Sequence, residues 1–132
     1  MRRAVKMKIL TLLFLRLSIS TVFAQDFFTT VRPMLKSGDA RQLSEYFNGT
    51  IDVTIGNNKS PYSKAQAELV LRDFFKANPP ADFTIMHTGS SKAGLKFAIG
   101  QYKSGKTAYS VLIRIRENEK NWLIHEISFV RE

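Results

Sequence analysis

Hydrophobic residues recur with a helical period in the middle of the chain. At about 100° per residue, five of them fall on one face of a helix. These residues are Ala67, Val70, Leu71, Phe74 and Phe75. A stripe of this width is typical of a surface helix that faces a protein core, so the pattern predicts an amphipathic helix that packs against a sheet.

This helix has a recognisable start and stop. Ser63 followed by Gln66 matches a capping box, in which the serine oxygen accepts a bond from a free helix amide and the glutamine reaches back. Pro79 and Pro80 end the helix, because proline lacks the backbone donor and the residue before it avoids the helical region. We therefore place the helix within the run from Pro61 to Pro80.

Two shorter helices are predicted ahead of it, between residues 26 and 47. The first has its apolar residues on one face: Phe27, Val31, Met34 and Leu35. Pro33 predicts either a late start near Thr30 or a kink. Asp39 is expected to cap the second helix. Its apolar side consists of Leu43, Tyr46 and Phe47.

Elsewhere the apolar residues alternate with a period of two, which predicts strands. One strand is expected from Thr50 to Ile55, followed by a turn at residues 56–58. Four more follow the helix, with faces formed by Phe83–Ile85–His87, Phe97–Ile99–Gln101, Tyr109–Val111–Ile113–Ile115 and the run 122–130. The last run alternates imperfectly, which predicts a bulge or burial on both faces.

The order of these elements predicts an α+β fold. Four consecutive strands joined by hairpin loops give an antiparallel sheet. We expect three helices packed on one face of a strongly curved antiparallel sheet. A strongly bent sheet around a helix forms a cone, and a cone has an open mouth.

The first 24 residues have the pattern of an export signal. Basic residues near the start precede an apolar run from Ile9 to Leu15, and Val22–Phe23–Ala24 fits a cleavage site before Gln25. Arg16 interrupts the apolar region, so a retained amphipathic anchor or a cytoplasmic extension stays open as an alternative. We predict a signal peptide at 1–24, a single domain at 25–132, and a periplasmic or extracellular location without an integral membrane segment.

Removing the leader changes the charge balance. The whole chain has a net charge of +9, but residues 25–132 carry 15 basic and 11 acidic side chains, a net charge of +4. A charge of this size is typical of a solvated surface, so no nucleic-acid partner is expected. The chain has no cysteine, so this domain of 108 residues must be held by packing rather than by disulfides.

The order of elements resembles the cone-shaped fold named for nuclear transport factor two, also called cystatin-like. More narrowly, the runs SGDARQLSEYF, YSKAQAELVLRDFFKANPP and HTGSSKAG–KFAIG resemble a family of small exported bacterial proteins of unknown function. The resemblance covers roughly residues 26–131. It implies the fold and an envelope location, and it transfers no activity and no functional residues.

The residues that could carry chemistry form no known catalytic or metal-binding pattern. His87 and His125 are the only histidines, and their spacing matches no metal motif, so we predict no metal site and no cofactor. The wider fold group does include enzymes that use acid–base chemistry inside the cone. An isomerase- or dehydratase-like enzyme is therefore the alternative function. Its candidate residues are Asp52, Tyr62, His87, Tyr109, Arg114 and Glu126.

The preferred interpretation is a non-catalytic binding or interaction module of the bacterial envelope. Its cone is expected to hold a small apolar ligand. The expected pocket is lined by Phe74, Phe83, Phe97, Tyr109 and Trp122. The competing interpretation is that these aromatic side chains fill the cone. The outer sheet face, which mixes Leu112 with Arg114 and Arg116, is predicted to form a homodimer interface.

Overall fold

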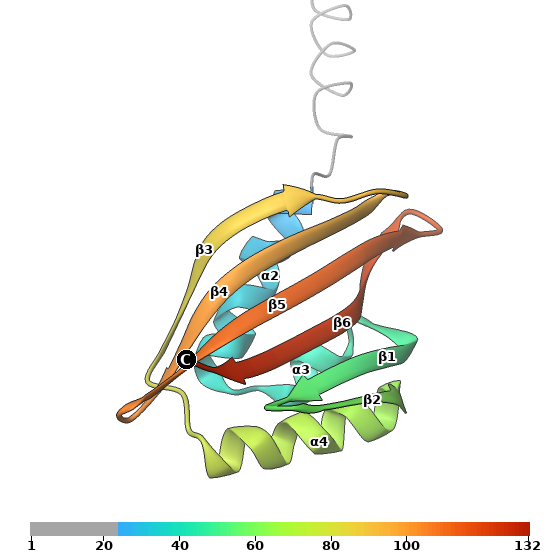
Figure 1. Cartoon of the computed structure of the whole chain (residues 1–132). Coiled ribbons are helices and arrows are strands. Elements are labelled where there is room, and N and C mark those ends of the chain that lie inside the picture. The colour runs from blue at the N-terminus through green and yellow to red at the C-terminus, as the bar shows by residue number, and fades with distance from the viewer. Residues whose placement is uncertain (1–23) are drawn as a thin grey trace, which may run out of the picture.

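Helices cover one face of a six-stranded sheet in the computed structural model, which describes residues 24–132 (Figure 1). The predicted signal peptide lies almost entirely outside these residues. The described helices are α2 (Ala24–Ser37), α3 (Ala40–Ser44) and α4 (Lys64–Ala77). The strands are β1 (Phe47–Ile55), β2 (Asn58–Ser63), β3 (Asp82–Ser90), β4 (Leu95–Ser104), β5 (Thr107–Asn118) and β6 (Asn121–Arg131). The predicted α+β fold is confirmed.

The sheet has the strand order β2-β1-β6-β5-β4-β3. Four of its five pairings are antiparallel. Three of these join the last four strands, as predicted, and the fourth joins β1 to β2. The fifth, between β1 and β6, is parallel. It arises because α4 carries the chain to the far edge of the sheet, and the four strands that return from there bring β6 alongside β1 in the same direction.

Helix α4 has the predicted start. The Ser63 oxygen accepts a bond from the Gln66 amide at 3.2 Å, and the Gln66 side chain accepts one from the Ser63 amide at 3.2 Å. The helix is shorter than the run from Pro61 to Pro80, because Pro61 and Tyr62 belong to β2, a strand that was not predicted. Proline lacks a donor for the sheet, and β2 accordingly lies at the edge.

Two other boundaries differ from the prediction. Phe47 was expected on helix α3 but begins β1, where it pairs with Ile124. The late start near Thr30 is wrong, because α2 begins at Ala24 and runs through Pro33 to Ser37. Asp39 caps α3 as predicted, with its side chain accepting a bond from the Gln42 amide at 3.0 Å.

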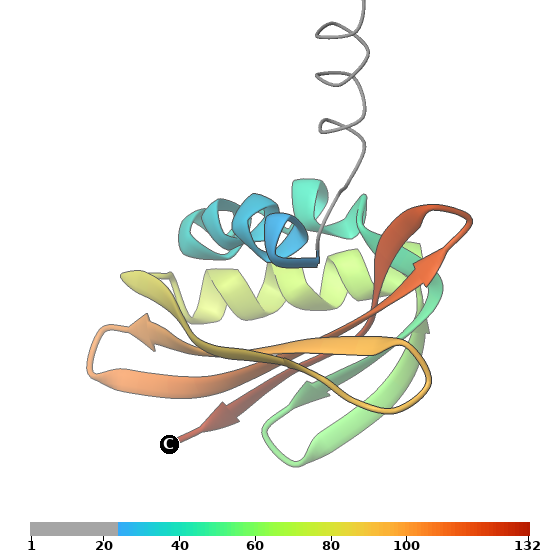
Figure 2. The ribbon, with the colours of Figure 1, turned by 90° about the horizontal axis from the view of Figure 1, so that it is seen from above.

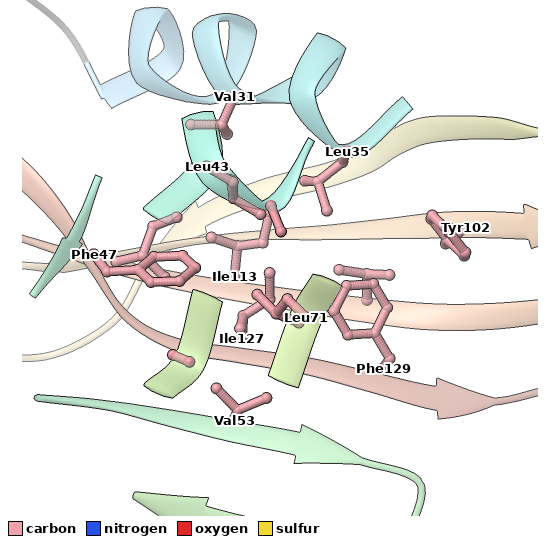
Figure 3. Close-up of a cluster of buried hydrophobic side chains, with 14 of the residues drawn as sticks. Val31, Leu35, Leu43, Phe47, Val53, Leu71, Tyr102, Ile113, Ile127 and Phe129 are labelled. Carbon is pink, nitrogen blue, oxygen red and sulfur yellow. The ribbon is translucent and has the colours of Figure 1, made fainter. Parts of the chain in front are cut away.

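The core lies between the sheet and the helix layer (Figure 3). Figure 3 shows Val31 and Leu35 from α2, and Leu43 from α3, pointing toward Ile113 and Ile127 of the sheet. These five side chains are at most 1% exposed. Burying each large aliphatic side chain stabilises the fold by about 1.5–3 kcal/mol, so the helices are held chiefly by their apolar faces.

Two bulges decide which side chains point inward. In β6 the register shifts between the pairs Arg114–Glu126 and Ile115–Ile124, so that His125 is the extra residue. This confirms the bulge predicted for the last strand and turns Ile124 into the core, where it is 0% exposed. In β3 the extra residue is Met86, and bulges of this kind bend and twist a sheet.

Candidate functional site

The interior is closed where α4 ends. Aromatic rings from the helix and the sheet meet here, with 4.5 Å between the ring centroids of Phe74 and Phe129 and 5.2 Å between those of Phe74 and Tyr109. Tyr102 packs against Phe129 at 5.7 Å and is fully buried. Spacings of this kind are those of packed aromatic pairs, so these side chains leave no room for a ligand between them.

The polar atoms of this cluster are also satisfied. The Tyr102 hydroxyl donates to the backbone oxygen of Asn78 at 2.6 Å, and the Tyr109 hydroxyl donates to its side-chain oxygen at 2.8 Å. The Asn78 amide nitrogen in turn donates to the Phe74 carbonyl at 3.2 Å, at the C-terminal end of α4. Burial, helped by the neighbouring Tyr109, raises the pKa of Tyr102 above its ordinary value.

A hollow of about 590 Å³ opens at the other end of the β5–β6 hairpin. Figure 2 shows this hairpin bending out of the sheet on the side of the helices. The hollow lies between the hairpin, the start of α2 and the end of α3. It is lined by Asp26, Phe27, Thr30, Glu45, Tyr46, Asn118, Glu119, Lys120, Asn121, Trp122 and Leu123. Its size falls in the range of small-molecule sites.

Aromatic side chains form part of the wall of this hollow. The rings of Phe27 and Tyr46 meet edge to face at 5.6 Å. Trp122 and Tyr46 are half-buried and pack against the core. The sequence pattern predicts Phe27 and Tyr46 only as core residues. A helical stripe of apolar residues has the same spacing whether other side chains cover it fully or it forms part of the wall of a hollow. Of the five side chains predicted to line a pocket, Trp122 is the one that lines this hollow.

The rim of the hollow is polar and includes a tight turn. Glu119 and Lys120 connect β5 to β6 with φ angles of 48° and 71°. Two consecutive residues with positive φ are typical of a type I′ hairpin turn, which favours Asn-Gly. A side chain in this left-handed region carries a cost, so two charged residues hold the rim in a strained conformation.

A second, smaller hollow of about 230 Å³ lies on the face of the sheet away from the helices. Its lining residues are Thr50, Asp52, Leu95, Arg114, Arg116, His125 and Glu126. Glu126 is held between two cations, with its carboxylate 3.2 Å from the Arg114 guanidinium and 3.7 Å from the Lys59 ammonium. Its side chain is only 15% exposed, so these bonds occupy the carboxylate.

His125, the bulge residue of β6, lines the same hollow. Its Nε2 atom is buried and has no hydrogen-bond partner in residues 24–132. Burial, and to a smaller extent the positive charge of Arg116, lowers the pKa of His125. The imidazole is therefore held in its neutral form near pH 7.

The predicted catalytic residues do not form one site. Asp52 and Glu126 are neighbours on the outer face of the sheet, and Arg114 joins them. The other three lie elsewhere: Tyr62 on β2, His87 exposed on β3, and Tyr109 in the closed aromatic cluster. The predicted acid–base residues therefore do not meet inside the cone, since His87 and Tyr109 lie on opposite faces of the sheet.

The predicted pocket also needs a correction. Phe74, Phe83 and Tyr109 belong to the packed core, with at most 8% of each side chain exposed. Phe97 lies on the outer face, because its neighbour Ala98 is the buried one and strand residues alternate. Its ring covers Gly89, where an added Cβ would stand 2.6 Å from it. These side chains therefore cannot line one cavity.

Comparison with protein families decides where the chain belongs. The model of DUF4783, a domain of unknown function, matches residues 28–129. The chain belongs to this family. No curated protein matches it. Within residues 24–132, no helix is long and apolar enough to cross a membrane. The same residues contain no group of three or more His, Cys, Asp or Glu side chains that could hold a metal ion.

Solved structures agree with this assignment. A DUF4783 family protein from Bacteroides uniformis is 24% identical, with 77% of this chain and 94% of that chain covered and a TM-score of 0.73. One from Bacteroides fragilis is also 24% identical, with 77% and 95% covered and a TM-score of 0.72. An NTF-2-like protein of unknown function from Silicibacter pomeroyi is 13% identical, with 82% and 92% covered and a TM-score of 0.60. These likenesses confirm the predicted NTF2-like fold.

Proposed function

We propose that this DUF4783 protein is a non-catalytic module that binds a small ligand in the hollow at the β5–β6 hairpin. One observation carries the proposal. The domain has a hollow of about 590 Å³ with aromatic walls at one end, while the aromatic cluster at the other end is tightly packed. Pockets with apolar walls and a few polar groups at the rim are typical of small-molecule sites.

We further propose that the protein works in the bacterial envelope, on the periplasmic or extracellular side. This proposal rests on the sequence of residues 1–24, where basic residues precede an apolar run and a compact cleavage site. Mass spectrometry of protein recovered from an exporting host tests it. A chain that begins at Gln25 supports export, and an uncleaved chain in the cytoplasmic fraction contradicts it.

Native mass spectrometry of gently purified protein tests ligand binding directly. We expect a reproducible added mass on the wild-type chain. Trp122→Ala should lose this mass, because the indole forms part of the wall of the hollow. Phe97→Ala removes an aromatic side chain from the opposite face of the sheet and should keep it. A bare chain mass in the wild type, or equal retention by both variants, contradicts the proposal.

A second candidate function is self-association through the outer face of the sheet. Three partly exposed apolar side chains, Ile99, Leu112 and Val130, lie on this face beside the Arg114–Glu126 ion pair. An isologous interface brings the same patch of both copies together, so these apolar side chains of one copy would meet those of the other.

Light scattering over a range of protein concentrations tests this second candidate. We expect a dimer in the wild type and a shift toward monomer in Leu112→Glu, since a carboxylate would then be buried at the centre of the interface. Ala65→Glu, an exposed change on α4 in the helix layer, serves as the control for added negative charge. A wild-type monomer at high concentration contradicts self-association.

A further inference from the structure

The charge around the hollow is opposite to that of the domain as a whole. Residues 25–132 carry a net charge of +4. The lining of the hollow has three carboxylates, on Asp26, Glu45 and Glu119, and one ammonium, on Lys120, which together give a net charge of −2. A concave site with one dominant sign of charge raises the local concentration of ligands of the opposite sign.

The side chains of these carboxylates form no ion pair or hydrogen bond within residues 24–132. In the described part of the chain, six of the eleven acidic side chains form ion pairs or hydrogen bonds. The side chains of Asp26, Glu45 and Glu119 form neither. They account for three of the remaining five, and all three lie at the same hollow, so the free carboxylates of the domain are concentrated here.

Local structure does not explain two of the three positions. Glu45 directly follows α3 as its C-terminal cap residue, where the helix dipole disfavours a negative charge. Glu119 has a φ of 48°, a conformation that favours glycine or asparagine. Sequences tend to break such local rules at functional sites. Asp26 differs, because the first turn of α2 is a favourable place for an acidic residue.

The walls of the hollow fit a particular kind of cation. The rings of Phe27, Tyr46 and Trp122 line it, and an ammonium group is attracted to the face of an aromatic ring, most strongly to that of tryptophan. A metal ion would instead need several converging oxygen or nitrogen ligands. Aromatic walls combined with rim carboxylates match an organic cation, whose alkyl groups need apolar contact and whose charge needs an acidic partner.

We propose that the hollow selects an organic ammonium ion, with its alkyl groups against Trp122 and Tyr46 and its charge beside Glu45 and Asp26. This inference rests on the proposed ligand-binding function and adds the chemical class of the ligand. The aromatic rings supply contact area, and the carboxylates discriminate the charged ligand from a neutral one of the same shape.

The single tryptophan of the chain makes a direct test possible, because Trp122 lines the hollow. The full-length protein is titrated with choline and separately with 3,3-dimethyl-1-butanol, a neutral molecule of the same shape, while tryptophan fluorescence is recorded. We expect choline to bind about tenfold more tightly, the order of magnitude that a cation–π contact and exposed carboxylates provide. This preference should shrink as salt is added.

Two conservative variants assign the preference to the carboxylates. Asp26→Asn and Glu45→Gln keep the shape of the side chains and remove the charge, so together they should abolish most of the tenfold preference. Glu117→Gln is the matched control, since Glu117 lies on β5 near the same hairpin but does not line the hollow. Its choline affinity should stay within about twofold of the wild type.

Each other outcome overturns the inference. Equal affinity for both probes would show that the hollow binds ligands without discriminating by charge, and the proposed ligand-binding function would still hold. A preference for choline that persists in the double variant would remove the carboxylates from recognition. If neither probe binds, the preference for an organic ammonium ion is wrong, and native mass spectrometry tests the ligand-binding function separately. An added mass that Trp122→Ala loses supports ligand binding in the hollow. Without an added mass, the ligand-binding function is wrong as well.

Discussion

The two ends of the β5–β6 hairpin both collect aromatic side chains, yet they differ in what surrounds the rings. At the closed end, Tyr102 and Tyr109 donate their hydroxyl hydrogens to Asn78, and the rings pack within 4.5–6.2 Å of one another. At the open end, Phe27, Tyr46 and Trp122 border a hollow whose rim carboxylates have no protein partner within residues 24–132.

The difference shows that aromatic content does not by itself indicate a binding site. At the closed end, each ring contacts other rings of the cluster and the hydroxyls of Tyr102 and Tyr109 each have an acceptor, so the cluster contributes stability. At the open end, Tyr46 and Trp122 are only half-buried, and they border a hollow instead of further rings. Substitutions at the two ends should therefore separate stability from binding.

The largest expected effect is at the closed end. Phe74→Ala removes a ring that contacts Phe75, Tyr102, Tyr109 and Phe129. It should lower the free energy of unfolding by about 3–5 kcal/mol, because a cavity remains where the ring was. Trp122→Ala at the open end should lower it by about 1–2 kcal/mol, since the indole is already half-exposed. Urea denaturation measures both, and equal losses would contradict the contrast.

The next effect concerns the polar centre of the closed cluster. Asn78→Ala leaves the Tyr109 hydroxyl without its acceptor and α4 without a side-chain cap. We expect a loss of about 1–3 kcal/mol in urea denaturation, the usual cost of an unsatisfied buried polar group. Asn58→Ala, on the exposed edge strand β2, is the control and should change stability by less than about 0.5 kcal/mol. A neutral Asn78→Ala would mean that the cluster does not depend on this residue.

The sequence predicted the features of the fold that depend on local periodicity. The capping box at Ser63 and Gln66, the apolar stripe of α4 and the long alternation of β5 all correspond to observed elements. These features are local, because helix and strand periods and a cap are set by residues a few positions apart. The α+β fold followed from their order.

What the sequence could not supply depends on long-range geometry. The bulge at Met86 puts His87 on the outer face, although Phe83, Ile85 and His87 read as one strand face. Strand alternation also cannot say which face is the inner one, so Phe97 was assigned to the wrong side. The open hollow depends on how far α2, α3 and the β5–β6 hairpin stand apart, and no local pattern encodes that distance.

Alkaline pH should act through the closed end. Burial and Tyr109 raise the pKa of Tyr102 in the folded protein, so the unfolded chain loses this proton first, above the ordinary tyrosine pKa of about 10. Between these two pKa values the folded state binds more protons, and stability falls as the pH rises. Tyr102→Phe should flatten this fall in urea denaturation, whereas Tyr62→Phe on β2 should keep it. An unchanged slope in Tyr102→Phe would contradict the assignment.

The smallest effect, and one of opposite sign, is expected at the rim of the open end. Lys120 has a φ of 71°, in a region where glycine has no steric cost. Lys120→Gly should therefore raise the free energy of unfolding by about 0.5–1 kcal/mol. Lys106→Gly is the matched control in the β4–β5 turn, where Gly105 already takes the positive φ. That change should destabilise the fold slightly, because glycine adds freedom to the unfolded chain. A higher free energy of unfolding in Lys120→Gly alone would show that the native rim is less stable than its backbone allows. A lower free energy of unfolding in Lys120→Gly would contradict the prediction, because the contacts of Lys120 would then outweigh the backbone strain.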